Sequence, residues 1–318
     1  MKCEKCLKSL TAKLVVGTLA YFCMAGLANA AVLVNDTWID GTDDDPAAPV
    51  YSEAGVDSDV DGDIESAWFQ GGSGELNPVG AGGPLRGTVL TSSASWTSYF
   101  TAEGSEVNLQ NTGDSLKVTW AFSATGINAS NGSQNMRLAL VDSTAATRLV
   151  SNGSPGDDFY TGYGMFMNFG QTTGRSSPFR LVERADTFGA ILSSSSEWST
   201  VADAPGFGDG AVGYSNGTPY TLEMTITRAA GNLLDITTTM TGGNINGTGS
   251  VSVSASGLSP NNGSFKFDTF SLRPSNAVTT ADMFDTSLFR VEFTPIPEPA
   301  SLVLVGLSGL AMVCRRQR

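Results

Sequence analysis

Apolar and polar side chains alternate with a period of two residues along the middle of the chain, and this pattern restricts the fold that the chain can adopt. Residues 116–122 place apolar side chains at every second position, as a strand does when one of its faces is buried. Residues 220–226 and 234–240 repeat this pattern on either side of Gly231 and Asn232, which predicts a β-hairpin. No apolar stripe of helical period and useful length accompanies them, so the predicted fold class is all-β.

Further candidate strands are separated by turn residues. They cover residues 136–141, 164–169, 179–183, 251–255, 265–272 and 288–293. Short strands at this spacing predict an antiparallel β-sandwich. The inward alternation changes face between Phe267 and Phe270, which predicts a bulge near Asp268. The Gly-rich stretch 71–87 is expected to be a long loop.

The N-terminus has the three parts of a secretory leader. A lysine-bearing head precedes an apolar stretch at 14–27, and small residues follow at Ala28 and Ala30 before Ala31. This order predicts a signal peptide over residues 1–30 that is cleaved after Ala30. The alternative is an uncleaved membrane helix, for which the apolar stretch is short.

The C-terminus is also tripartite. Pro297, Glu298 and Pro299 precede an apolar stretch at 300–313, and arginines end the chain. The prolines block continuation of a strand or helix, the apolar stretch is expected to form a short transmembrane helix, and the arginines stay in the cytoplasm. The predicted anchor positions are Ala300, Leu302, Val303, Leu304, Val305, Leu307, Leu310 and Val313, and the predicted basic stop is Arg315, Arg316 and Arg318.

This tail closely resembles the PEP-CTERM sorting signal of Gram-negative bacteria. The resemblance implies recognition by an exosortase, a membrane transpeptidase, in bacteria that make exopolysaccharide. It therefore predicts an exported protein that is transiently anchored in the inner membrane and finally placed at the cell surface, in the outer envelope or in the extracellular matrix. The alternative is an ordinary tail anchor with a chance Pro-Glu-Pro.

Three stretches of the middle region, 136–142, 163–168 and 267–272, resemble strands of concanavalin A-like and laminin-G-like sandwiches. That resemblance implies a jelly-roll of two curved antiparallel sheets, in a superfamily whose concave face often binds glycans. A sandwich of other topology is the alternative. The predicted organisation is a leader (1–30), a β-sandwich ectodomain (31–294) whose first part (31–87) is acidic and Gly-rich, and a sorting and anchor segment (295–318).

The net charge of −13 disfavours nucleic acid as a partner, because an anionic surface repels phosphate backbones. Residues 31–65 hold eleven acidic residues and no Lys or Arg. An excess of carboxylates that no basic side chain relieves can hold divalent cations. The four cysteines all fall in the terminal segments, so no disulfide framework is expected in the ectodomain.

The sharpest local motif spaces carboxylates at alternate positions around Gly62. Its members are Asp57, Asp59, Asp61, Asp63 and Glu65. This spacing is typical of calcium loops, in which a glycine permits the bend that turns successive carboxylates toward one ion. The motif departs from the EF-hand, which has Glu at its twelfth position where this chain has Trp68. The alternative is an acidic, solvated turn, and the run Asp43 to Asp45 is interpreted as solvated.

The chain contains no histidine, which removes triads and zinc sites built on imidazole. Glycoside hydrolysis needs only two carboxylates, but the sequence lacks the closely spaced Glu-x-Asp-x-Glu strand of laminarinase-like sandwiches. The predicted function is therefore that of a non-catalytic surface or matrix protein associated with exopolysaccharide. The alternatives are a carbohydrate-active enzyme of the same fold, either a hydrolase or a lyase, and a purely structural adhesion or coat protein.

Glycan contacts would need exposed aromatic side chains. The candidates are Trp68, Trp96, Tyr99, Tyr160, Tyr163, Trp198 and Tyr214. Each is also a plausible core residue, and Trp120, on an alternating strand, is assigned to the core. The run 193–196 is interpreted as a polar loop.

Overall fold

A computed structural model of the protein describes residues 30–143, 148–156, 159–260 and 263–296. Antiparallel strands make up nearly all of the regular structure. The strands are β1 (Ala31–Asp36), β2 (Trp68–Pro78), β3 (Leu85–Tyr99), β4 (Val107–Asn108), β5 (Ser115–Thr125), β6 (Ser130–Asn131), β7 (Met136–Asp142), β8 (Thr161–Met167), β9 (Thr172–Thr173), β10 (Phe179–Arg184), β11 (Trp198–Asp203), β12 (Pro219–Ala229), β13 (Leu233–Gly242), β14 (Ser250–Leu258), β15 (Lys266–Phe267), β16 (Thr269–Pro274) and β17 (Met283–Thr294). A 3-10 helix, η2, covers Ile245–Gly247. Within the described ranges, no helix combines the length and the apolar character that a bilayer crossing requires.

The predicted strands and hairpin are confirmed. In β12, buried Leu222, Met224 and Ile226 alternate with half-buried polar residues. Ile226 pairs with Leu116 of β5 on one side and with Ile236 of β13 on the other. The alternation therefore works as predicted, because each strand directs one row of side chains into the core.

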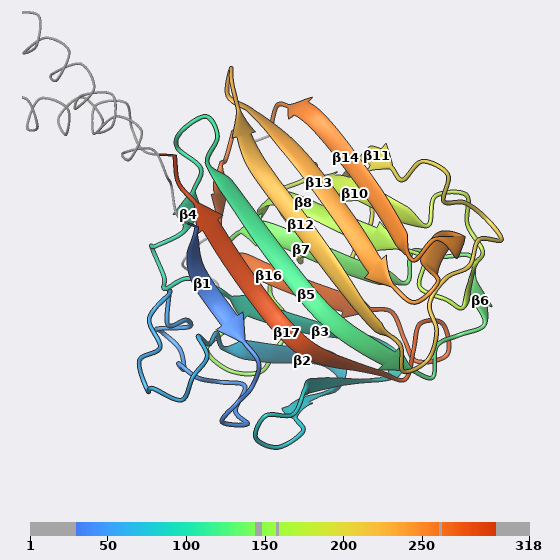
Figure 1. The fold of residues 1–318 in the computed structure, drawn as a ribbon, viewed down its shortest axis with the longest axis horizontal. Coiled ribbons are helices and arrows are strands. Elements are labelled where there is room, and N and C mark those ends of the chain that lie inside the picture. The colour runs from blue at the N-terminus through green and yellow to red at the C-terminus, as the bar shows by residue number, and fades with distance from the viewer. Residues whose placement is uncertain (1–29, 144–147, 157–158, 261–262, 297–318) are drawn as a thin grey trace, which may run out of the picture. The chain divides into compact units, whose positions relative to one another are not determined.

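The sheet folds over on itself into two layers through β3, and the predicted antiparallel sandwich is confirmed. The first residues of β3 pair with β17, and its last residues, from Trp96 to Tyr99, pair with β16. The strand order is β11-β10-β8-β7-β16-β3-β17-β5-β12-β13-β14. Figure 1 shows β5, β12, β13 and β14 in front of β7, β8 and β10. At the far edge β14 lies against β10 and β11.

The main core lies between the layers and is rich in aromatic rings. Trp120 stacks on Phe122 with 3.9 Å between ring centroids, and Phe169 stacks on Tyr214 at the same distance. Trp120 is fully buried, as predicted, and its indole N–H donates to Thr286 Oγ1 at 3.0 Å. Rings of this size supply most of the apolar burial that holds two sheets together.

The stretch 71–87 is not a long loop, and that prediction was wrong. Most of it belongs to a hairpin in which β2 pairs with β3 along nearly its whole length, with a register shift between Gly72 and Gly74. Gly87 is required by packing, because a Cβ at this position would overlap the Trp96 indole ring. The glycines thus let the two strands and an aromatic side chain approach closely, which a composition rich in glycine does not reveal.

A bulge was predicted near Asp268, and the structure instead has a break there between β15 and β16, which pair with different strands. The Asp268 side chain is buried and forms an ion pair with Arg148 at 2.7 Å. It also accepts hydrogen bonds from Ser143 N at 2.8 Å and Ser143 Oγ at 2.7 Å. Burial of a carboxylate here is therefore compensated by a charge and by several donors.

The acidic start of the described chain takes part in the sandwich. β1 pairs with β17, with Ala31 opposite Phe293. Trp38, directly after β1, is fully buried and contacts the Trp68 ring with 6.4 Å between centroids. The segment from 39 to 67 then returns to the sandwich at β2 and carries ten of the eleven acidic residues of the stretch 31–65.

Candidate metal centre

Two turns of the segment between β1 and β2 come together to form an acidic cluster. Asn35 N donates to Ile64 O at 2.7 Å, and Trp68 N donates to Asp43 O at 2.7 Å. A further isolated bridge joins Ser52 and Ser66. These backbone contacts bring the loop that follows β1 beside the loop that precedes β2, so carboxylates separated by about 20 residues become neighbours.

Glu65 is the central residue of this cluster. Its side chain is only 2% exposed, and its Oε2 has no hydrogen-bond partner. Burial, followed by the charges of nearby aspartates led by Asp40 and Asp36, raises the pKa of Glu65 to about 9. Burying a carboxylate oxygen without a partner destabilises the fold. Binding of a proton or of a cation would remove this unfavourable free energy.

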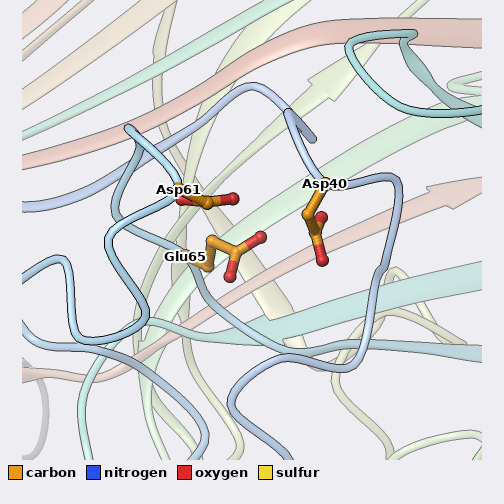
Figure 2. Close-up of side chains that lie close together, drawn as sticks. All are labelled: Asp40, Asp61 and Glu65. Carbon is orange, nitrogen blue, oxygen red and sulfur yellow. The ribbon is translucent and has the colours of Figure 1, made fainter.

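Asp40, Asp61 and Glu65 direct their carboxylates toward a common space (Figure 2). One oxygen from each lies within 4.8 Å of the others. Asp61 Oδ2 is also buried without a partner. Oxygens bound to one calcium ion lie at most about 5 Å apart, since each is 2.3–2.6 Å from the ion. These three residues are therefore spaced to bind one hard cation together.

Two neighbouring sets extend the cluster. Asp45 and Asp59 meet the same spacing criterion with Glu65, and Glu53, Asp57 and Asp59 form a third group. Of the five predicted ligands, Asp57, Asp59, Asp61 and Glu65 thus fall in groups of this kind. They do not all converge on one point, because they are distributed over three overlapping sets.

Asp63 is placed differently from the other predicted ligands. Its Oδ2 accepts from Thr37 N at 2.7 Å and from Thr37 Oγ1 at 2.8 Å, so it ties the two turns together. Its Oδ1 is buried without a partner. Asp36, which is also buried, accepts from Trp38 N at 3.1 Å. Burial raises the pKa of Asp36 well above its usual value, so this carboxyl group holds its proton more tightly than an exposed aspartate does.

Asp40, Asp45 and Glu53 were not among the predicted ligands. The alternate spacing around Gly62 pointed to one loop, whereas the cluster takes carboxylates from both turns. The sequence feature that could have identified these three residues is the high density of acidic residues in 31–65, where no Lys or Arg occurs. Within the described part of the chain, none of the ion pairs involves an acid of this segment. The run at 43–45, interpreted as solvated, holds a half-buried Asp43 whose pKa burial raises to about 6.

The seven aromatic residues considered for sugar stacking are all buried. Their exposed fractions range from 1% to 7%, for Trp68, Trp96, Tyr99, Tyr160, Tyr163, Trp198 and Tyr214. None of them is therefore available as an open sugar platform. Among the described residues, the exposed aromatic rings are those of Phe159 and Phe188, at 61% and 57% exposure, which contact each other edge to face.

The predicted terminal sites fall largely outside the described residues. Leader residues 1–29, including Ala28, lie there, as do Pro297, Glu298, Pro299 and all anchor and arginine positions after them. Ala30 and Ala31, which flank the expected cleavage point, are described, and Ala31 begins β1.

Comparison with known proteins bears on the tail and on the fold. The model described as the PEP-CTERM protein-sorting motif matches residues 295–318, which confirms the predicted resemblance of the tail. No curated protein matches the chain in sequence. The chain carries this sorting motif, and the motif match covers no part of the sandwich.

Solved structures similar to the chain include a carbohydrate recognition domain and a lectin-like defence protein. The VIP36 exoplasmic/lumenal domain in a Ca2+/Man2-bound form is 13% identical, with a TM-score of 0.45, covering 79% of this chain and 90% of its own. The Emp46p carbohydrate recognition domain in a metal-free form is 12% identical, with a TM-score of 0.40, covering 70% and 87%. Arcelin-5, a lectin-like defence protein from Phaseolus vulgaris, is 11% identical, with a TM-score of 0.38, covering 71% and 92%.

Proposed function

We propose that this chain is an exported, non-catalytic protein of the cell surface or extracellular matrix, whose sandwich associates with exopolysaccharide. The observation that carries the proposal is the match of residues 295–318 to the PEP-CTERM protein-sorting motif. In this account a signal peptidase removes the leader after Ala30, and the apolar stretch 300–313 holds the chain in the inner membrane until an exosortase acts near Pro297–Pro299. The body then remains outside the cytoplasm.

A non-catalytic role is supported by the lack of histidine and by the lining of one pocket among the described residues. The chain has no histidine, and a hydrolase of this fold would need two carboxylates facing an open cleft. A pocket of about 460 Å³ beside Thr37 and Phe122 is lined by one carboxylate, Asp285, which is already paired with Arg86. Asp63 and Glu65, the pair with the closest sequence spacing to a catalytic dyad, are each only 2% exposed.

The association with polysaccharide is tested by binding and cleavage measured together. The full-length chain in mild detergent is incubated with neutral and acidic polysaccharides, and both co-sedimentation and newly formed reducing ends are recorded. We expect retention without reducing ends. Release of reducing ends would favour the enzyme of the same fold, and the absence of both signals would favour a purely structural adhesion or coat protein.

We further propose that the acidic cluster binds calcium, with Asp40, Asp61 and Glu65 as the central ligands. The buried, unpartnered Oε2 of Glu65 supports this assignment, because a divalent cation would relieve the charge that neither a donor nor a basic side chain relieves. The ion would join the two turns and so stabilise the start of the ectodomain against β1 and β2. Metal bound only by the folded state adds to its stability.

Calcium at about a hundred times its dissociation constant should raise the melting temperature by roughly 5 °C. The shift should disappear in Asp61→Asn and in Asp59→Asn, measured by thermal unfolding with and without chelator. Asp209→Asn is the matched control, because Asp209 is an exposed aspartate outside the cluster. An unchanged melting temperature at millimolar calcium in the unmodified chain would remove the calcium proposal.

A further inference from the structure

A small pocket of about 120 Å³ lies on the face of the sheet that points away from the main core. Its floor comes from β3 and β16 through Ser95, Ser271 and Arg273, and its rim includes Ser154 and Ser193. The neighbouring residues Trp96 and Leu272 belong to the main core, so the pocket residues occupy the opposite face by strand alternation. Among the described residues, no carboxylate lines this pocket.

Arg273, which lines the pocket, lies opposite a second arginine on the neighbouring strand. Arg273 of β16 pairs directly in register with Arg137 of β7. Arg273 Nη2 donates to Ser93 Oγ at 2.7 Å. Arg137 Nη1 donates to Leu192 O at 2.8 Å, and its guanidinium lies 4.9 Å from the centre of the Phe166 ring. Both side chains are half-buried, and Arg137 Nε is buried without a partner.

Neither arginine has an ion-pair partner within the described ranges. A third arginine nearby does have an acidic partner. Arg180 lies opposite Phe166 in register and forms an ion pair with Asp203 at 2.7 Å. Burial, and then the charge of Arg273, lowers the pKa of Arg137, while Glu197 partly offsets this. Burial lowers the pKa of Arg273 as well.

Like charges placed directly opposite on neighbouring strands destabilise a sheet. This chain has 31 acidic residues, so an arginine without a carboxylate partner is not explained by a shortage of acids. Arg273 donates to Ser93 through Nη2, and the other N–H groups of its guanidinium can bind a planar oxyanion in the pocket. An anion bound there would also relieve the repulsion between the two arginines.

We infer that this pocket binds the carboxylate of an acidic sugar unit in a polysaccharide, with Arg273 as the charged contact and the serine hydroxyls around it as hydrogen-bond partners. Arg137 contributes positive potential and holds the loop that carries Leu192 and Ser193 over the pocket. The volume of about 120 Å³ accommodates about four water molecules, which suits the carboxylate end of a sugar with its ring outside. This inference rests on the proposed association with polysaccharide and specifies its chemistry.

The test uses the full-length chain in mild detergent, titrated with polygalacturonate, with neutral dextran and with free galacturonate. Chelator is present throughout, so that calcium cannot bridge the polyanion to the acidic cluster. We expect saturable binding of polygalacturonate, weaker binding of free galacturonate and none of dextran at this site. Arg273→Gln should weaken polygalacturonate binding about tenfold, as expected for loss of a charged hydrogen-bond partner.

A second pair of variants keeps the test valid if Arg273→Gln fails to fold. Ser193→Glu adds a carboxylate at the exposed rim of the pocket and should abolish binding, whereas Ser195→Glu adds the same charge to the same exposed loop outside the pocket and should have a smaller effect. Arg86→Gln, which removes an arginine paired with Asp285 elsewhere, controls for net charge.

Three outcomes would overturn the inference. Equal weakening by Arg273→Gln and Arg86→Gln would show that only overall charge matters. Binding of free galacturonate without binding of the polymer would show that the pocket takes a small acid and not a polysaccharide. Tight binding of dextran that none of these variants changes would mean that the chain binds polysaccharide at another site. The proposed function would then stand, and the inference about this pocket would fail.

Discussion

At the scale of single residues, Glu65 connects stability to pH. Its ordinary pKa is 4.5, and in the metal-free folded chain it is raised to about 9. The folded state therefore keeps its proton over a range in which the unfolded state has lost it. The contribution of Glu65 to folding stability is fully present below about pH 4.5 and is lost as the pH rises toward about 9.

The stability of the metal-free chain should consequently fall as pH rises from about 4.5 to about 9. Glu65→Gln should remove much of this slope, because a glutamine cannot lose a proton. Denaturant unfolding at a series of pH values, with chelator present, measures the effect. The same substitution at Glu75, an exposed acid, serves as control, and a slope that Glu65→Gln leaves unchanged would contradict the assignment.

At the scale of elements, β3 holds the two layers together, and Gly87 is the position at which its packing is least tolerant. Gly87→Val would force a side chain against the Trp96 indole, and overpacking of this kind costs about 1–3 kcal/mol. Urea unfolding should show that loss. Gly156→Ala, where a Cβ meets open space, should change stability by less than about 0.5 kcal/mol. Equal effects of the two variants would argue against this packing.

Strict alternation predicts strands that are buried on one face, whereas β7 and β8, which were also predicted, are buried on both faces. β5, β12 and β13 alternate without interruption because one row of each points into the core and the other does not. β2 and β3 escaped prediction because the Gly71–Gly87 composition indicates a turn, while the packing of Gly87 under Trp96 depends on tertiary structure. Only part of the acidic cluster was predicted, again because it depends on tertiary structure. Asp40 and Glu65 lie close together only because the backbone hydrogen bond from Asn35 to Ile64 joins their two turns.

At the scale of the whole molecule, the proposed sorting route predicts the ends of the native protein. The leader should be absent, with Ala31 as the first residue, and the last residue should lie near Pro299. Intact-mass measurement of protein recovered from the producing cells checks both ends in one experiment. A native chain that still ends at Arg318 would count against exosortase processing, and a chain that still begins at Met1 would count against the leader.

The position of β17 has a consequence for the order of events during biosynthesis. This strand is the last of the sandwich to be synthesised, yet it lies between β3 and β5 and also pairs with β1. A nascent chain that has not yet delivered Met283–Thr294 lacks the strand that bridges its two halves. We expect a chain that ends before this point to be open and sensitive to proteases. The matched sorting motif, residues 295–318, follows β17 directly, so a chain that carries the motif also carries the strand that completes the sandwich.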